Sequence, residues 1–257
     1  MNILILGDII GEKSVKRVKE ILPNIIKENK IDFVIANGEN SAGGMGITEK
    51  IYKDLVLAGV NVITMGNHTW GKKDIFNIIE NKNLLRPANY PRGVLGNGYG
   101  IYECNNKKIA VINLIGRVDI NVLSENPFII ARDIVNRIKD NVDITIVDFH
   151  AEATAEKIAM AYFLDGKVTC LYGTHTHVAT ADETILENGT AYITDIGMCG
   201  PKKSVIGMDV DVSIKRFVTT LPERYKVSED KEIICNACIL KLNSESCRVE
   251  KFSRIKL

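Results

Sequence analysis

The sequence predicts an α/β protein built around a parallel β-sheet that is covered by helices on both faces. Two observations support this fold class. Short apolar runs alternate with amphipathic segments along the first 80 residues, which is typical of β–α–β units. The runs, such as "NILILGD" and "IDFVIAN", are apolar throughout instead of alternating with polar residues. A strand has this composition when both of its faces are buried.

The first third of the chain supplies three strand–helix units. Strands are expected in residues 2–8, 31–40 and 60–68, and helices in residues 14–30, 48–59 and 72–82. The first helix has apolar residues at helical spacing, but Pro23 is expected to break or kink it. Thr48 is expected to cap the second helix and Gly59 to end it.

The rest of the chain begins with the same alternation and ends in strands. The expected elements are a hairpin over 99–115, a helix at 127–140, a strand at 143–150, a helix at 154–166, a strand at 167–175, a hairpin over 184–198 that turns at Asn188-Gly189, a helix near 209–218 and two strands in 232–257. No linker, repeat or low-complexity stretch interrupts the pattern. We therefore expect one domain, residues 1–257.

Composition excludes several classes of partner. The formal net charge is +1, so no broad basic field points to a long nucleic acid, although local groups could still bind a small phosphate. The apolar run at the N-terminus is too short for a signal peptide, and no segment approaches the roughly 20 apolar residues of a membrane span. We expect a cytoplasmic protein without a membrane association.

The six cysteines are expected to be reduced thiols. Cys235 and Cys238 form a CxxC motif in a segment that is typical of a strand, where a spacing of three places the thiols on opposite faces. A structural zinc would also need a second pair, and only Cys247 is near in sequence. These cysteines are therefore not expected to bind metal.

Polar side chains recur where the predicted strands end. The set contains all four histidines of the protein and consists of Asp8, Glu39, Asn40, Asn67, His68, His150, His175 and His177. Because the carboxyl ends of parallel strands lie along one edge of a sheet, we expect these residues to share a ligand site. His175 and His177 are separated by one residue, so in an extended segment both side chains would point to the same face.

The donor types favour a metal centre. Carboxylate, amide and imidazole groups without a thiolate suit iron, manganese or zinc, and the donors are too many for one tetrahedral zinc. Two ions roughly 3.5–4 Å apart and bridged by a carboxylate would use them all. Such a pair lowers the pKa of a shared water to give hydroxide, and binds the attacking and leaving oxygens of a phosphate ester.

Several motifs resemble a known family. The order "GD", "GEN", "GNH", His150 and "GTHTH" is similar to the signature of the calcineurin-like metallophosphoesterases, with two departures: Ile10 stands where that family has a histidine, and Glu39 where it has an aspartate. These departures, together with "ENSAGGMGIT", "MGNHTWG", "RPANYP" and "TDIGMCGP", resemble the YmdB-like bacterial phosphodiesterases over nearly the whole chain.

The resemblance implies a fold, a site and an activity. The implied fold is a β-sandwich of two mixed sheets flanked by helices. Glu39 would bridge two metal ions, iron or manganese most often, with zinc as an alternative. The implied ligands of the first ion are Asp8, Asn40 and His177, and those of the second are Asn67, His150 and His175. The substrate would be a small phosphoester, a 2′,3′-cyclic nucleotide such as 2′,3′-cyclic AMP. The branch is also associated with homo-oligomers and with regulation of gene expression.

Some roles and alternatives stay open at this point. His68 is a candidate for protonating the leaving oxygen or stabilising the transition state. The segment 41–48 is either a turn or a lid that closes over substrate, and Cys199 has no chemical role that the sequence indicates. The rival functions are a metal-dependent amidohydrolase, whose His-x-His pair lies on the first strand of a (β/α)₈ barrel, a phosphatase of different substrate range, and a regulatory protein that retains the metal site.

Overall fold

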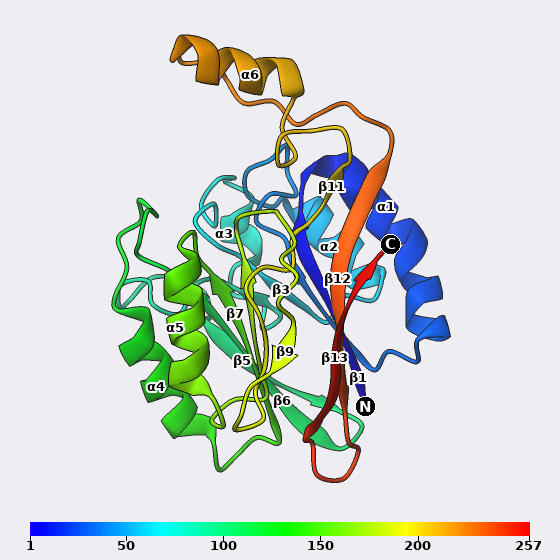
Figure 1. The fold of residues 1–257 in the computed structure, drawn as a ribbon, viewed down its shortest axis with the longest axis vertical. Helices are drawn as coiled ribbons and strands as arrows, with labels where there is room; N and C mark the ends of the chain where they lie inside the picture. The colour runs from blue at the N-terminus through cyan, green and yellow to red at the C-terminus, as the bar shows by residue number, and fades with distance from the viewer.

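Two β-sheets pack face to face, and helices cover the outer face of each (Figure 1). The computed structural model describes all residues, 1–257. The predicted fold class, a β-sandwich of two mixed sheets flanked by helices, is confirmed. The (β/α)₈ barrel of the amidohydrolase alternative is absent, because the strands form two separate sheets.

The seven-stranded sheet contains both chain termini. Its order is β13 (Val249–Lys256), β12 (Ile233–Leu242), β11 (Met198–Pro201), β1 (Asn2–Ile9), β2 (Phe33–Asn37), β3 (Val62–Thr64) and β4 (Leu84–Leu85). Strands β11, β1, β2, β3 and β4 are parallel, whereas β12 runs antiparallel to β1, β11 and β13. The predicted strands near the C-terminus thus complete the sheet that the first strand begins.

The six-stranded sheet comes from the middle of the chain. Its order is β5 (Tyr99–Cys104), β6 (Lys107–Ile115), β7 (Ile144–His150), β8 (Cys170–Thr174), β10 (Ala191–Ile193) and β9 (Thr184–Ile185). The four central strands are parallel, and the two edge strands pair antiparallel as the expected hairpins β5–β6 and β9–β10.

The chain forms six helices. Five of them lie close to the predicted positions, and the third is much shorter than predicted. They are α1 (Gly11–Glu28), α2 (Glu49–Leu57), α3 (Ile75–Ile78), α4 (Pro127–Ile138), α5 (Thr154–Leu164) and α6 (Val210–Thr219). The expected break at Pro23 is wrong: α1 continues to Glu28, because buried Leu22 and Ile25 hold the helix against the sheet on both sides of the proline. The third helix is only one turn long, where a helix over 72–82 was expected.

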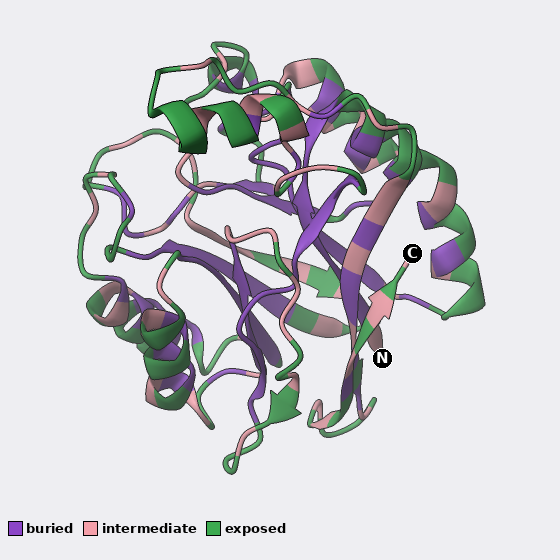
Figure 2. Cartoon of the chain, turned by 45° about the horizontal axis from the view of Figure 1, so that its top comes forward, coloured by how far each residue is buried: buried purple, intermediate pink, exposed green.

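Three apolar clusters separate the four layers. Strand residues such as Ile5 and Ile146 meet between the two sheets, while the other two clusters join each sheet to its helices. Figure 2 shows the central strands buried along their length. Cys235 belongs to a helix-side cluster and Cys238 to the inter-sheet cluster, so the predicted opposite faces of the CxxC motif are confirmed. All six cysteines are free thiols.

A long excursion joins β11 to β12, and we call residues 202–232 the cap segment. Its two ends are tied together by an ion pair between Lys202 and Glu232 and by an amide hydrogen bond from Lys203 to Asp230. Beyond this neck, α6 projects from the body of the molecule and is exposed over most of its length (Figures 1 and 2). None of the six helices combines the length and apolar composition needed to cross a bilayer.

Candidate metal centre

The predicted site residues converge at one edge of the sandwich, as the strand-end argument requires. Asp8 lies near the end of β1, His150 ends β7, and the remaining six residues follow β2, β3 or β8 directly. Both sheets therefore contribute. The glycine of the "GNH" motif is required by this convergence, because a Cβ at Gly66 would overlap both Glu39 Oε2 and His150 Nε2.

One group of donor atoms surrounds the imidazole of His150. Its Nε2 atom is 2.9 Å from Asn67 Oδ1, 3.0 Å from Glu39 Oε1 and 3.0 Å from His175 Nδ1. The three titratable members, Glu39, His150 and His175, offer ligand atoms that all lie within 4.8 Å of one another. Four lone-pair atoms at these separations fit a single cation placed among them.

Hydrogen bonds behind His150 fix which nitrogen faces this group. His150 Nδ1 is 2.9 Å from Thr174 Oγ1, and that hydroxyl donates to Asp148 Oδ1 at 2.7 Å. Since the hydroxyl proton is used on the carboxylate, Thr174 accepts from Nδ1–H and leaves Nε2 to face the other donors. Asp148 also accepts from Thr64 and is fully buried. Asp148 and Thr174 were not predicted as site residues, although a carboxylate inside an apolar strand run was a signal.

A second group of donors contains Asp8, Asn40 and His177. Asp8 Oδ1 and Asn40 Oδ1 are buried and have no hydrogen-bond partner. His177 donates from Nδ1 to the carbonyl oxygen of Ile206 at 2.8 Å, which directs its Nε2 toward Asp8 Oδ1, 3.9 Å away. Buried oxygens without a donor are costly unless a cation neutralises them, so these orphaned atoms fit a metal ion.

The charge balance of the site also favours a bound cation. Burial would lower the pKa of His150, but the charge and hydrogen bond of Glu39 raise it to about 9. Burial would raise the pKa of Glu39, but His150 and then His68 bring it down to about 2. Burial raises the pKa of Asp8 to about 6. Burial and the nearby charge of His150 lower the pKa of His175 to about 3. One positive charge is thus stabilised among these atoms, and a metal ion that binds there displaces the proton.

The His175–His177 turn is not the extended segment that the sequence analysis assumed. Strand β8 ends at Thr174, and both histidines have positive φ, 99° and 66°. The two rings still line one cavity. That earlier expectation was wrong about the backbone, because the chain leaves the sheet one residue before the pair.

A buried ion pair holds this unusual turn. Asp195 Oδ2 accepts from the amide of Thr176 at 3.1 Å and from its hydroxyl at 2.8 Å. The same oxygen pairs with Lys157 Nζ at 2.7 Å, and both charged side chains are inaccessible to solvent. Backbone conformations of this kind persist only when surrounding contacts enforce them. Asp195 lies in the "TDIGMCGP" motif, so this motif contributes to the site by holding the histidine turn.

The donors open into a cavity of about 420 Å³. His68 lines it, and its backbone amide donates to Glu39 Oε2 at 2.9 Å. Gly43, Gly44 and Met45 of the segment 41–48 form part of the wall, and Asn40 Nδ2 donates to the carbonyl oxygen of Gly44 at 3.2 Å. No lysine or arginine lines this cavity. Cys199 does not reach it, because it is buried in the core between the sheet and α1.

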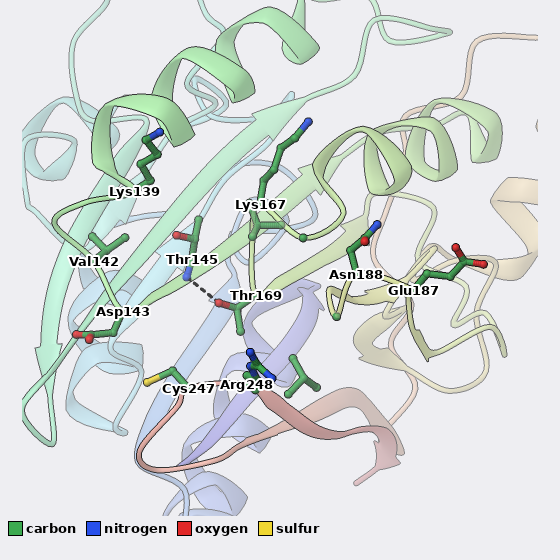
Figure 3. Close-up of a pocket in the computed structure, with 14 residues that line it drawn as sticks. Lys139, Val142, Asp143, Thr145, Lys167, Thr169, Glu187, Asn188, Cys247 and Arg248 are labelled. Atoms are coloured by element: carbon green, nitrogen blue, oxygen red, sulfur yellow. Dashed lines mark hydrogen bonds between the residues drawn. The ribbon is translucent and has the colours of Figure 1, made fainter.

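A second cavity, of about 620 Å³, lies away from these donors (Figure 3). It is bordered by Lys139, Lys167 and Arg248, and the amide of Thr145 donates to Thr169 Oγ1 within it. None of the predicted site residues lines it. It is larger than the cavity beside the donors, but of these two only the smaller one is lined by Glu39, Asn40 and His177.

The two-sheet fold, with carboxylate, amide and imidazole groups gathered at the strand ends, is that of the metallophosphoesterases. Within this class, the chain belongs to the YmdB-like protein family, whose model matches residues 4–255. The resemblance seen in the sequence motifs is thereby confirmed.

Similar proteins cover the chain almost end to end. A 2′,3′-cyclic-nucleotide 2′-phosphodiesterase of Bacillus subtilis (strain 168) is 44% identical over 256 residues, which are 99% of this chain and 96% of the relative. The crystal structure of a novel phosphatase from Mycoplasma pneumoniae has a TM-score of 0.94 and 39% identity, covering 100% of this chain and 93% of that one. The crystal structure of a hypothetical protein from Thermus thermophilus also has a TM-score of 0.94, with 35% identity and coverage of 100% and 99%.

Proposed function

We propose that this protein is a dinuclear metal-dependent phosphodiesterase that hydrolyses 2′,3′-cyclic nucleotides. The observation that carries the proposal is the convergence of Glu39, Asn67 and His175 on His150 Nε2, beside the orphaned oxygens of Asp8 and Asn40. The name of the Bacillus subtilis relative supports the substrate. In the proposed ligand assignment, Asp8, Asn40 and His177 would hold one ion and Asn67, His150 and His175 the other, while Glu39 would contribute to both.

An anionic substrate is consistent with the cavity only if cations are bound. The cavity wall contains the carboxylates of Glu39 and Glu152 but no lysine or arginine, so no lysine or arginine of the wall would attract a phosphate. Two bound ions would reverse this balance, bind the phosphate oxygens and lower the pKa of a water molecule between them. Carboxylates therefore serve a phosphate site here by holding its cations.

The residues of the chain have separate roles in the proposed reaction. The hydroxyl group of water forms a bond to phosphorus, the bond between phosphorus and O2′ breaks, and O2′ takes a proton, which leaves a nucleoside 3′-phosphate. His68 is the proposed proton donor, because its ring lines the cavity while its amide is fixed on Glu39 Oε2. Thr174 and Asp148 hold the His150 ring in the orientation that a ligand needs.

Metal removal tests the proposal directly. The purified protein should hydrolyse 2′,3′-cyclic AMP to 3′-AMP, and a chelator should lower the rate at least about a hundredfold because the cavity has no other cations. Adding back Mn²⁺ or Fe²⁺ should restore the rate, and Zn²⁺ provides a comparison. Product analysis by chromatography and metal counting by mass spectrometry are the measurements. Two bound metals without turnover on any phosphoester would favour the regulatory alternative.

Replacement of His68 tests the assignment of the proton donor. His68→Ala should lower kcat for 2′,3′-cyclic AMP by about 10²- to 10⁴-fold, because the alkoxide at O2′ would leave without a proton. The metal content should stay at the wild-type value, since the backbone amide that bonds Glu39 is retained. Stopped assays and metal analysis on the same preparation measure both. Loss of metal in this variant would instead make His68 a ligand or a structural residue.

The metal, the domain organisation, the location and the oligomeric state are also proposed. Iron or manganese is the proposed metal, with zinc as the alternative, since the donors are oxygens and imidazoles and are too many for one tetrahedral zinc. Residues 1–257 are proposed to form one domain, because the two sheets share an apolar core. A cytoplasmic location and a homo-oligomeric state complete the proposal.

A further inference from the structure

The cap segment supplies an apolar wall to the cavity that holds the proposed metal ligands. Its contributions are Val205, Ile206, Met208, Ser213, Phe217 and Tyr225. Two of these side chains are aromatic and unusually accessible, with Phe217 79% exposed and Tyr225 51% exposed. Exposed aromatic side chains that gather beside polar groups in a concave site are typical of ligand-binding surfaces.

We propose that Phe217 and Tyr225 form the surface that binds the nucleobase of the substrate. This inference rests on the proposed function, because it places the phosphate at the donors of Glu39, His175 and His177. Those three residues and the two aromatic side chains line one continuous cavity of about 420 Å³, within the usual range for small-molecule sites. A nucleotide whose phosphate is held at one end therefore places its base along the other.

Local contacts fix the two aromatic rings on the cavity side. Ser213 and Phe217 are four residues apart on α6, so they share one face of the helix, and both line the cavity. The guanidinium of Arg216 lies 3.8 Å from the ring centroid of Tyr225 and donates to the carbonyl oxygen of Glu223 at 2.7 Å. Arg216 covers one face of the Tyr225 ring, and because Tyr225 is half exposed and lines the cavity, the ring also offers accessible surface on which a base could stack.

The wall is also connected to a proposed metal ligand. The carbonyl oxygen of Ile206, in the cap segment, accepts a hydrogen bond from His177 Nδ1 at 2.8 Å. Met208 pairs with Val205 and with Val227 in short β-bridges, which hold the base of the cap segment together. The base of the cap segment is therefore attached to the end of the cavity that contains His177.

A smaller cavity of about 300 Å³ lies on the other side of His68 and His175. It is lined by Asn67, Asp119, Ile120, Asn121 and Val122 in addition to those two histidines, so it offers a base no aromatic side chain apart from the imidazoles. Stacking on an aromatic ring accepts any base, because each base has a π-face. The geometry thus favours the cap segment, and predicts low selectivity among the four bases.

Phe217→Ala and Tyr225→Ala test the inference by comparing two substrates. Each variant should raise the KM for 2′,3′-cyclic AMP about tenfold while kcat changes little, because the lost stacking acts on binding. Hydrolysis of 1-O-methylribose 2,3-cyclic phosphate, which has no base, should be unchanged. Val218→Ala is the matched control: this side chain is 77% exposed on the same helix but does not line the cavity.

Equal losses on both compounds, or no change on either, would overturn the base-binding role. Equal losses accompanied by a change in sedimentation would identify the wall as a contact between copies of the chain. Calorimetric binding of 3′-AMP, which needs no turnover, separates this inference from the proposed function. The wild-type protein could hydrolyse neither compound and still bind 3′-AMP about tenfold more tightly than Phe217→Ala does. That result would support the base-binding role and contradict the proposed reaction. Absence of binding to the wild type overturns the base site.

Discussion

Glu39→Gln should abolish hydrolysis of 2′,3′-cyclic AMP, with kcat/KM reduced on the order of 10³-fold. Glu39 is only 1% exposed, and its two oxygens face different partners, His150 Nε2 at 3.0 Å and the His68 amide at 2.9 Å. A glutamine amide presents only one oxygen, so one of these two positions is occupied by an NH₂ group, which cannot bind a cation. The variant also removes the negative charge with which one carboxylate would hold two cations.

The measurement pairs activity with metal content. We expect Glu39→Gln to fold, since the volume of the side chain is unchanged, and to bind fewer than two metals per chain. The matched control is Glu152→Gln, in the same cavity, whose carboxylate is half exposed and 3.1 Å from His175 Nε2. Because Glu152 touches only the outer nitrogen of His175, its loss should cost at most about a hundredfold. If Glu39→Gln keeps the activity and the metal content of the wild type, Glu39 is not a metal ligand.

This substitution also separates catalysis from regulation. If the protein acts in the cell by hydrolysing its substrate, a chromosomal Glu39→Gln replacement should reproduce the phenotype of a deletion. If the folded metal site serves only to contact a partner, the same replacement should leave the phenotype of the wild type. The readout is the growth and transcript profile of the three strains.

The local sequence pattern predicted most of the strands and most of the helices, but not the short strands β4 and β11. The continuous apolar runs that predicted buried parallel strands became β1, β2, β7 and β8, because both faces of these strands meet an apolar layer. The errors came where tertiary contacts outweigh local preference. Pro23 was expected to interrupt α1, yet the packing of Leu22 and Ile25 on the sheet keeps the helix whole.

The residues that converge at the site could be predicted because each follows a strand end, but their supports could not. Asp148 reaches His150 only through Thr174, and Lys157 reaches Thr176 only through Asp195. Periodicity predicts which face of an element is buried and does not specify its polar partner on another strand. The same limit applies to the cap segment. A helix near 209–218 was expected, but its position beside the proposed metal ligands depends on tertiary contacts.

The second large effect is expected at Lys157, the charged residue buried in α5. Lys157→Met should lower the free energy of unfolding by about 3–5 kcal/mol, because it leaves the carboxylate of Asp195 buried without its cation. Lys157 and Asp195 are both fully inaccessible, and Nζ lies 2.7 Å from Oδ2. Methionine keeps most of the volume of lysine, so the loss reports the missing charge and not a cavity.

Urea unfolding followed by circular dichroism measures the loss, with Lys53→Met as the matched control. Lys53 pairs with Glu49 at 2.6 Å on the exposed face of α2, so its replacement should leave the unfolding midpoint nearly unchanged. Adding Asp195→Asn to Lys157→Met should recover part of the stability, since the unpaired charge is removed. An equal midpoint for Lys157→Met and Lys53→Met would show that the buried pair does not stabilise the fold.

The same variant should also weaken metal binding, which ties the ion pair to the site. Asp195 holds the amide and the hydroxyl of Thr176, and these bonds keep His175 and His177 at their positive φ angles. When Lys157 is absent, Asp195 loses the cation that fixes its Oδ2 atom beside Thr176, so the hydrogen bonds to Thr176 weaken and the histidine turn relaxes toward ordinary backbone angles. Metal titration of the folded fraction at low temperature should then show about 10- to 100-fold weaker binding. If Lys157→Met reduces the stability but leaves the affinity for metal unchanged, the ion pair stabilises the fold without supporting the metal site.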